Sequence, residues 1–359
     1  MSRSAFAVLA LTAALPAGAD TLVLVAGGGT EPHGKPPAEC RLREPFGTAF
    51  DKSGAMYIVE MVSGQRVLKV GADGLLTVVA GDGTKGDSGD GGPAAKARFN
   101  GIHSLCISAE GDLYLADTFN NKVRRIDAKT GVVTTVAGSG EKAFSGDGGP
   151  AEKAGIGGAF CAELDPTGAR LYIADLGNRR VRMVDLKTGV ITTVAGNGKK
   201  GVPADGADAK DSPLTDPRAV AVDSKGNLYI LERGGHALRV VDPAGKIRTV
   251  VGASGKAGAT GDGGDALAAT LNGPKHICID RHDNVIIADA ENHLIRNYLP
   301  AEGKIVRVAG TGRKGAAGVG GPPEKAELAR PHGVFVHADG TLYITDSYNN
   351  RVLKIVRGE

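Results

Sequence analysis

The sequence predicts an all-β fold, a six-bladed β-propeller in which each blade is a four-stranded antiparallel sheet. The first observation is a repeat, because an acidic residue closes the same short apolar run in six successive units, at intervals of 57 or 58 residues. The second is that the full units hold four short apolar runs each, separated by glycine, asparagine and aspartate. The third is that the strand missing from the last unit occurs at the start of the chain. The six acidic residues are Glu60, Asp117, Asp175, Glu232, Asp289 and Asp346.

The second unit shows the strand pattern most clearly. Its apolar runs lie at 105–107, 113–117, 123–127 and 132–137. Each run has the length of a strand and is bounded by turn-forming residues, and strands joined by such short turns are antiparallel neighbours. Runs such as 229–231 are apolar on both faces. Each sheet therefore needs another sheet on either side, which a ring of radially stacked blades provides.

The two ends of the chain predict how the ring closes. The sixth unit stops after its third strand, at 352–356, with too few residues left for a fourth. The N-terminal run 21–27, Thr-Leu-Val-Leu-Val-Ala-Gly, matches the outer strand of other units, for example 192–196. We therefore expect this run to complete the last blade and to leave no open hydrogen-bonding edge there.

The composition is that of an ordinary globular protein, with 42% hydrophobic and 23% charged residues among 359. Each repeat needs its neighbours to bury its faces, so we expect residues 20–359 to form a single propeller domain, as a monomer. The formal net charge of +3 is small and evenly spread. This charge argues against nucleic acid as a partner.

Residues 1–19 differ from the rest of the chain. Arg3 precedes an apolar run from Ala5 to Leu15, and 17–19, Ala-Gly-Ala, fits a small-residue cleavage pattern. This run is shorter than the ~20 residues that span a bilayer, so a secretory signal peptide is favoured over a membrane anchor. A frayed, alanine-rich terminus is the other interpretation. With a signal peptide, the mature chain is expected to be secreted or periplasmic and to have no transmembrane segment.

Export permits disulfides, and the chain has four cysteines. Cys106 and Cys278 hold equivalent positions three units apart, so a ring of six would place them on opposite sides of the axis, beyond bonding distance. We expect these two, Cys40 and Cys161 to be reduced and packed as small apolar groups. A bridge from Cys40 is the alternative.

Two segments carry a family resemblance. Residues 223–230, Asp-Ser-Lys-Gly-Asn-Leu-Tyr-Ile, and 174–181, Ala-Asp-Leu-Gly-Asn-Arg-Arg-Val, resemble the NHL repeat. The resemblance extends over all six units, and the first and fourth depart from it most. It implies a six-bladed β-propeller. It implies little about activity, because NHL propellers include protein- and RNA-binding modules, sensor domains and a few lyases, and a fold does not determine function.

Three linkers between units share a Gly-Asp-Gly-Gly motif, at 88–94, 145–151 and 260–266. A calcium or phosphate cradle is one interpretation, but one aspartate per motif is too few for calcium. We favour a turn followed by a short helix with proline in its first turn. The acidic residue that closes each second strand is likewise expected to be structural, as Asp346 would be if it held the turn at 349–351.

The residue just before each innermost strand is brought to the mouth of the central channel by the ring geometry. Two of these six positions carry aromatic side chains, two carry imidazoles and two carry cations. His276 lies beside the mouth, and His33, His236 and His293 map to the same end. Histidine binds metals and carries protons near neutral pH, so we expect a ligand site there. The expected site residues are Phe46, His103, Phe160, Arg218, Lys275, His276 and His332.

The sequence favours a non-catalytic binding propeller that holds a protein, peptide or glycan at this mouth and needs no cofactor. It has no nucleophile elbow, P-loop, zincin helix or Cys-x-x-Cys pair. Cations and aromatic surface with few carboxylates predict a ligand that has an anionic or polar group and an apolar part. If imidazolium forms take part, binding weakens as the pH rises through the range in which histidine titrates.

The alternative is a metal-dependent lyase or hydrolase. Here the chain is similar to peptidyl-amidoglycolate lyases, propellers in which three inward histidines bind zinc. The similarity carries over to His103 and His332 only, because the third position holds Arg218, which stays protonated. The lactonase-like propellers that hold calcium imply several inward oxygen ligands, and Glu163 is the one inward carboxylate expected here.

Overall fold

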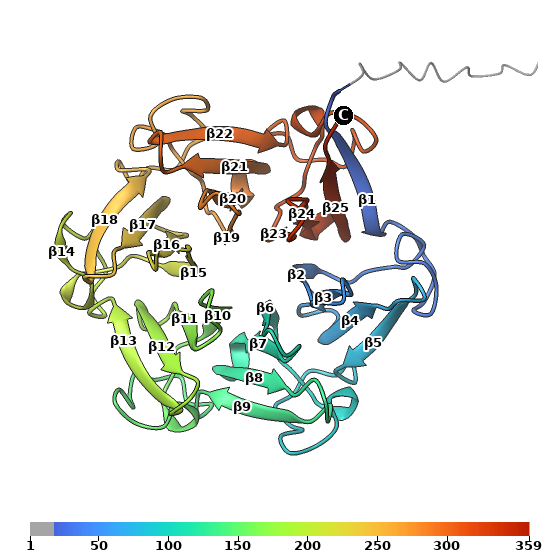
Figure 1. Ribbon diagram of the computed structural model, residues 1–359, viewed down its shortest axis with the longest axis horizontal. Helices are drawn as coiled ribbons and strands as arrows, with labels where there is room; N and C mark the ends of the chain where they lie inside the picture. The colour runs from blue at the N-terminus through green and yellow to red at the C-terminus, as the bar shows by residue number, and fades with distance from the viewer. Residues whose placement is uncertain (1–17, 359) are drawn as a thin grey trace, which may run out of the picture.

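The structure is a computed structural model that describes residues 18–358. The expected signal peptide at 1–19 therefore lies almost entirely outside the described residues. Six sheets are arranged radially around a central axis, each with one strand innermost (Figure 1). The predicted fold class, an all-β six-bladed propeller, is confirmed. No helix among residues 18–358 is long and apolar enough to cross a membrane.

The first three blades are regular four-stranded antiparallel sheets whose strands follow chain order from the axis outward. Blade one contains β2 (Pro45–Phe50), β3 (Met56–Glu60), β4 (Arg66–Val70) and β5 (Leu76–Ala80). Blade two contains β6 (Ile102–Ile107), β7 (Leu113–Asp117), β8 (Lys122–Ile126) and β9 (Val133–Ala137). Blade three contains β10 (Ala159–Leu164), β11 (Arg170–Asp175), β12 (Arg180–Asp185) and β13 (Val190–Ala195).

Blades four and five continue the same order. Blade four contains β15 (Pro217–Val222), β16 (Leu228–Glu232), β17 (Ala237–Val241) and β18 (Lys246–Val251). Blade five contains β19 (His276–Ile279), β20 (Val285–Asp289), β21 (Leu294–Leu299) and β22 (Lys304–Ala309). Blade four also has a fifth strand, β14 (Ala207–Asp208), which the sequence did not predict. It is a piece of linker that pairs with the outer strand β18.

The sixth blade joins the two ends of the chain. It contains β23 (Gly333–Val336), β24 (Leu342–Asp346), β25 (Arg351–Val356) and, as its outer strand, β1 (Thr21–Gly27). β1 pairs antiparallel with β25, from Thr21 opposite Val356 to Gly27 opposite Arg351, and the two strands lie side by side in Figure 1. The strand that the sixth unit lacks is thus supplied by the N-terminal run.

Glycine is required where each outer strand ends. Gly138 has a φ of +95°, and a Cβ atom there would lie 2.1 Å from the backbone oxygen of Asn121. Gly27 meets the carbonyl of Asn350 in the same way. The Val-Ala-Gly ending of the repeat is therefore explained by a close backbone approach that a side chain would block.

The linkers cover the outer edges of the blades. Pro93 bridges to Val132, and Pro150 bridges to Val190, so each linker runs against the outer edge of the blade that follows it. Single turns of 3₁₀ helix begin directly after the proline in two of the three Gly-Asp linkers, at Ala94 and Ala151, as the motif predicted. The third, 260–266, has Asp265 in place of the proline and forms a turn without a helix, so the prediction is wrong there. A further 3₁₀ turn begins after Pro322, in the linker that leads to blade six. Among residues 18–358 the 3₁₀ turns are η1 (Ala94–Lys96), η2 (Thr118–Asn120), η3 (Ala151–Lys153), η4 (Ala209–Asp211), η5 (Ala290–Asn292), η6 (Pro323–Lys325) and η7 (Ser347–Asn349).

The hydrophobic core lies between neighbouring blades. One cluster joins Ala162 and Leu171 of blade three to Cys106 and Tyr114 of blade two. All four cysteines are free. The prediction of reduced thiols is therefore confirmed, and the alternative of a bridge from Cys40 is wrong. The Cys40 thiol donates instead to the backbone oxygen of Pro32, 3.3 Å away.

Candidate functional site

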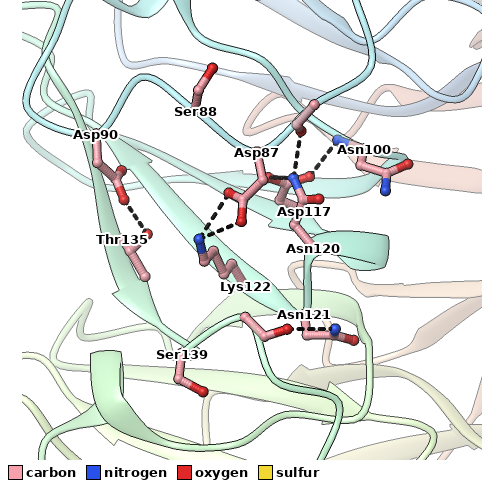
Figure 2. Close-up of polar contacts among 12 residues, drawn as sticks. Asp87, Ser88, Asp90, Asn100, Asp117, Asn120, Asn121, Lys122, Thr135 and Ser139 are labelled. Atoms are coloured by element: carbon pink, nitrogen blue, oxygen red, sulfur yellow. Dashed lines mark hydrogen bonds and ion pairs between the residues drawn. The ribbon is translucent and has the colours of Figure 1, made fainter.

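The acidic residue that closes each second strand is structural. Asp117 accepts the backbone N–H of Asn100 at 2.7 Å and the side-chain amide of Asn120 at 2.8 Å (Figure 2). Asp346 accepts the side-chain amide of Asn349 at 2.7 Å and Nε of Arg351 at 2.8 Å. Each such carboxylate joins a linker to a turn, which confirms the structural interpretation from sequence.

The Gly-Asp linkers are structural too. Asp90 accepts Nε of the fully buried Arg124 at 3.0 Å and the Thr135 hydroxyl at 2.6 Å, and the second contact is drawn in Figure 2. Asp147 accepts two hydrogen bonds from Arg182 in the next blade. The carboxylates of these loops neutralise buried guanidinium groups. They are therefore committed to the fold rather than left free for calcium.

The residues expected at the channel mouth do come together. We call the six that precede or begin the innermost strands the mouth layer: Phe46, His103, Phe160, Arg218, Lys275 and His332. The ring of Phe46 lies between the two imidazoles, with its centroid 4.1 Å from His332 and 5.2 Å from His103. Phe160 continues the row, 4.7 Å from His103. Because Phe160 alone in the layer is more than 7% exposed, these side chains form a packed layer.

Exposed aromatic residues surround one side of the mouth layer, and the sequence reasoning missed them. Phe119 in η2 is 48% exposed and lies against His103 and Phe160. Tyr348 in η7 is 49% exposed and stacks on His332 with an interplanar angle of 19°. Both residues stand two positions after the acidic residue of their unit, which is the signal that would have revealed them.

The other side of the mouth carries the cations. Lys275 pairs with Glu291 at 3.1 Å, and Arg330 pairs with the same carboxylate. Arg218 is different, because its Nη1 donates to the backbone oxygen of Phe160 at 3.1 Å and no carboxylate among residues 18–358 pairs with it. Its guanidinium lies 4.8 Å from the centroid of the Phe160 ring. Burial lowers the pKa of Arg218 to about 10, so the group stays charged at neutral pH.

Hydrogen bonds hold the two mouth histidines in fixed orientations, and their surroundings disfavour the charged form. Nδ1 of His103 lies 2.9 Å from the Thr118 hydroxyl, and Nδ1 of His332 lies 2.8 Å from the backbone oxygen of Arg330. Burial, and then the charge of Arg218, hold the pKa of both imidazoles well below the ordinary value of 6.5. These shifts favour neutral imidazoles near neutral pH, so the condition on which the pH-dependent binding rested, that imidazolium forms take part, is not favoured.

The other histidines have other places. His236 and His293 adopt the left-handed conformation at the ends of their turns, and each Nδ1 accepts a backbone N–H from the next blade, of Gly273 and Arg330 respectively. His276 was expected beside the mouth. The pleat of β19 places it one level deeper, against the channel cavity described below.

The side chains present do not fit a zinc ion. Within residues 18–358, no three His, Cys, Asp or Glu side chains are gathered at metal-binding distance. A catalytic zinc site needs three protein ligands and an open position. His103 and His332 are separated by the Phe46 ring, and Arg218 holds the third position.

A cavity of about 270 Å³ occupies the channel beyond the mouth layer, between the six innermost strands. Its wall is mostly aliphatic and aromatic, and includes Leu164, Val222 and Phe335. Glu163 of β10 also lines it. Burial raises the pKa of this carboxyl to about 8, against a smaller opposing effect of the Leu164 backbone amide.

Two protein-family models match the chain. The teneurin NHL domain matches residues 185–260, and the NHL repeat matches residues 328–355. The chain is 26% identical over 290 residues to the chloroplastic protein SUPPRESSOR OF QUENCHING 1 of Arabidopsis thaliana, an alignment that covers 77% of this chain and 27% of that protein. It is 25% identical over 342 residues to NHL repeat-containing protein 2 of Gallus gallus, covering 87% and 46%. The chain therefore spans less than half the length of these relatives.

Solved structures share the fold at low sequence identity. A protein of Bacteroides ovatus described as an auxiliary nutrient binding protein superposes with a TM-score of 0.69 at 16% identity, covering 95% of this chain and 78% of that one. The repeat motifs, the family matches and the six four-stranded blades agree with one another. This chain has the six-bladed β-propeller fold and is matched by NHL models at 185–260 and 328–355.

Proposed function

We propose that this propeller is a non-catalytic binding module whose ligand is a small anionic molecule, or an anionic group on a peptide or glycan, with a planar apolar part. The observation that carries the proposal is Arg218. It is a cation at the channel mouth, 4% exposed, with no carboxylate partner among the described residues. Burying an unpaired charge is unfavourable, and a bidentate anion is the partner that a guanidinium fits best.

The division of the mouth into two sides sets the shape of the ligand. Phe119 and Tyr348 present aromatic faces on the side of blades six, one and two. Arg218 and Lys275 lie on the side of blades four and five, and Glu291 already neutralises the lysine. A ligand that lays its apolar face on Phe119 directs its anionic group toward Arg218. Exposed apolar patches rimmed by polar groups mark binding sites on soluble proteins.

Similar proteins support a binding role in general terms. Two Bacteroides propellers of this fold are described as auxiliary nutrient binding proteins. Their identity to this chain is 16%, so their ligands are not transferred to it. Export to the periplasm or outside the cell belongs to the same proposal. N-terminal sequencing of the native protein tests the export step, with Asp20 as the expected first residue.

Isothermal titration with naphthoate, compared with its uncharged alcohol analogue, tests the mouth site. We expect Arg218→Met to lower the affinity for naphthoate by roughly 10- to 100-fold, which corresponds to one charge-assisted hydrogen bond. The affinity for the alcohol should not change. Phe119→Ala should weaken both probes. Phe144→Ala is the matched control, since Phe144 is 42% exposed but packs against Arg180 and Arg182, away from the mouth layer. Equal naphthoate affinity in wild type and Arg218→Met excludes the proposed site.

A further inference from the structure

The channel cavity holds an ionisable group that the mouth site does not use. Glu163 points to the same cavity as Cys106 and Cys278, and among residues 18–358 no side chain donates a hydrogen bond to its carboxyl and no cation pairs with it. Glu163 is partly exposed to the cavity, and protein surrounds the rest of its side chain. Arg218, which pairs with no carboxylate among residues 18–358, lies in the mouth layer and donates to the backbone oxygen of Phe160 instead.

The internal repeat shows that the fold does not need this carboxyl. The five equivalent positions in the other blades carry small or apolar residues, namely Ala49, Cys106, Ala221, Cys278 and Phe335. Burying a carboxyl that no side chain partners is unfavourable, and more so for the charged form than for the neutral form. A residue that breaks the local rule in one repeat of six, without a structural gain, marks a functional position.

The cavity selects the class of ligand. Its apolar wall favours an apolar body, and the carboxyl favours a cationic group, because a bound ammonium stabilises the ionised form and supplies the partner that this form lacks. A metal ion is not favoured, because the described residues gather no group of three His, Cys, Asp or Glu side chains that could hold one around Glu163. We propose that the channel cavity is a second binding site, which takes a small primary ammonium compound with an apolar body and pairs its ammonium with the Glu163 carboxylate.

The packed mouth layer separates this site from the first one. Phe46, His103 and Phe160 contact one another above the cavity, and none of them lines it. Pro166, in the turn after β10, does line it, and this turn belongs to the opposite rim of the ring. The ammonium ligand therefore enters from the face opposite the mouth, and the two sites can be tested independently.

Ligand-observed NMR and isothermal titration with benzylammonium and benzyl alcohol test the second site. In wild type we expect benzylammonium to bind about tenfold more tightly than the alcohol, the equivalent of one charge-assisted hydrogen bond. Glu163→Gln should remove this preference while leaving the thermal melt cooperative. Glu110→Gln is the control for non-specific attraction, because it removes an exposed carboxylate on the opposite rim and should leave the preference intact.

A second variant tests the cavity itself. Ala221→Leu keeps the Glu163 carboxyl but fills part of the cavity, so it should lower the affinity for both benzylammonium and benzyl alcohol. Naphthoate binding at the mouth reports whether the variant is folded. The inference is overturned if wild type binds neither probe at millimolar concentration, if it binds both equally, or if Glu163→Gln retains the preference for benzylammonium.

Discussion

Replacing Glu163 by glutamine should stabilise the protein by an amount that grows with pH. Burial raises the pKa of this carboxyl from 4.5 to about 8. In the pH range between these values the unfolded chain releases the proton and the folded chain keeps it. The free energy of unfolding of wild type therefore falls as the pH rises through this range. The Glu163→Gln variant does not show this fall, because glutamine does not titrate.

The magnitude follows from the size of the shift. One pKa unit corresponds to about 1.4 kcal/mol, so the advantage of Glu163→Gln should widen by about 2 to 3 kcal/mol between pH 6 and pH 9. The other groups around the cavity do not titrate in this window. Burial lowers the pKa of His276 to about 4 and raises the pKa of the Cys161 thiol to about 12. It also raises the pKa of the Cys106 and Cys278 thiols.

Urea unfolding at several pH values measures the difference between the two proteins. Surface groups titrate in both and cancel, and Glu110→Gln provides a second reference, because its carboxyl is fully exposed. A difference between Glu163→Gln and wild type that stays constant from pH 6 to pH 9 refutes the reasoning. Such a result would mean that the ionised carboxylate is as well solvated in the channel as in the unfolded chain.

Three further predictions concern the fold. Leu22→Ala should lower the free energy of unfolding by about 2 to 5 kcal/mol in urea titrations, because Leu22 is fully buried in the closing strand β1. Val23→Ala, at a partly exposed neighbouring position, should lower it less. Equal effects of the two substitutions would contradict this closure of the ring. Intact-mass measurement after alkylation under denaturing, non-reducing conditions should count four thiols; a count of two would show a disulfide. Asp346→Ala should lower the free energy of unfolding by roughly 3 to 5 kcal/mol in thermal or urea unfolding, because it leaves the buried Arg351 without its carboxylate. A loss below about 1 kcal/mol would show that the backbone oxygens around Arg351 are enough to stabilise its buried charge.

Most of the fold could be predicted from the sequence because its determinants are local and repeated. The acidic residue, the turn and the Val-Ala-Gly ending recur in register, and the truncated sixth unit matches the spare run at 21–27. β14 was not predicted, because it forms only where one linker pairs with the outer strand β18. The sequence repeat does not indicate this pairing.

The mouth was predicted only in part. Rotation about the axis identified the six residues of the mouth layer and placed Phe46 between His103 and His332, but it did not predict that the Phe46 ring would pack against both imidazoles. That contact joins residues more than 50 positions apart in the sequence. The neutral state of His332 follows from the same packing, since burial and the charge of Arg218 both disfavour the imidazolium. Tyr348 was not predicted because it lies in η7, after the second strand of its blade, and not among the residues before the innermost strands.

A crystal structure of the protein soaked with naphthoate would show where the anion binds. We expect the carboxylate to accept hydrogen bonds from the Arg218 guanidinium, at about 2.7 to 2.9 Å. The ring should lie on the aromatic side of the mouth, against Phe119 or Tyr348. Naphthoate bound elsewhere with Arg218 unliganded, or absent from crystals that retain the wild-type fold, would contradict the claim that this mouth is the binding site.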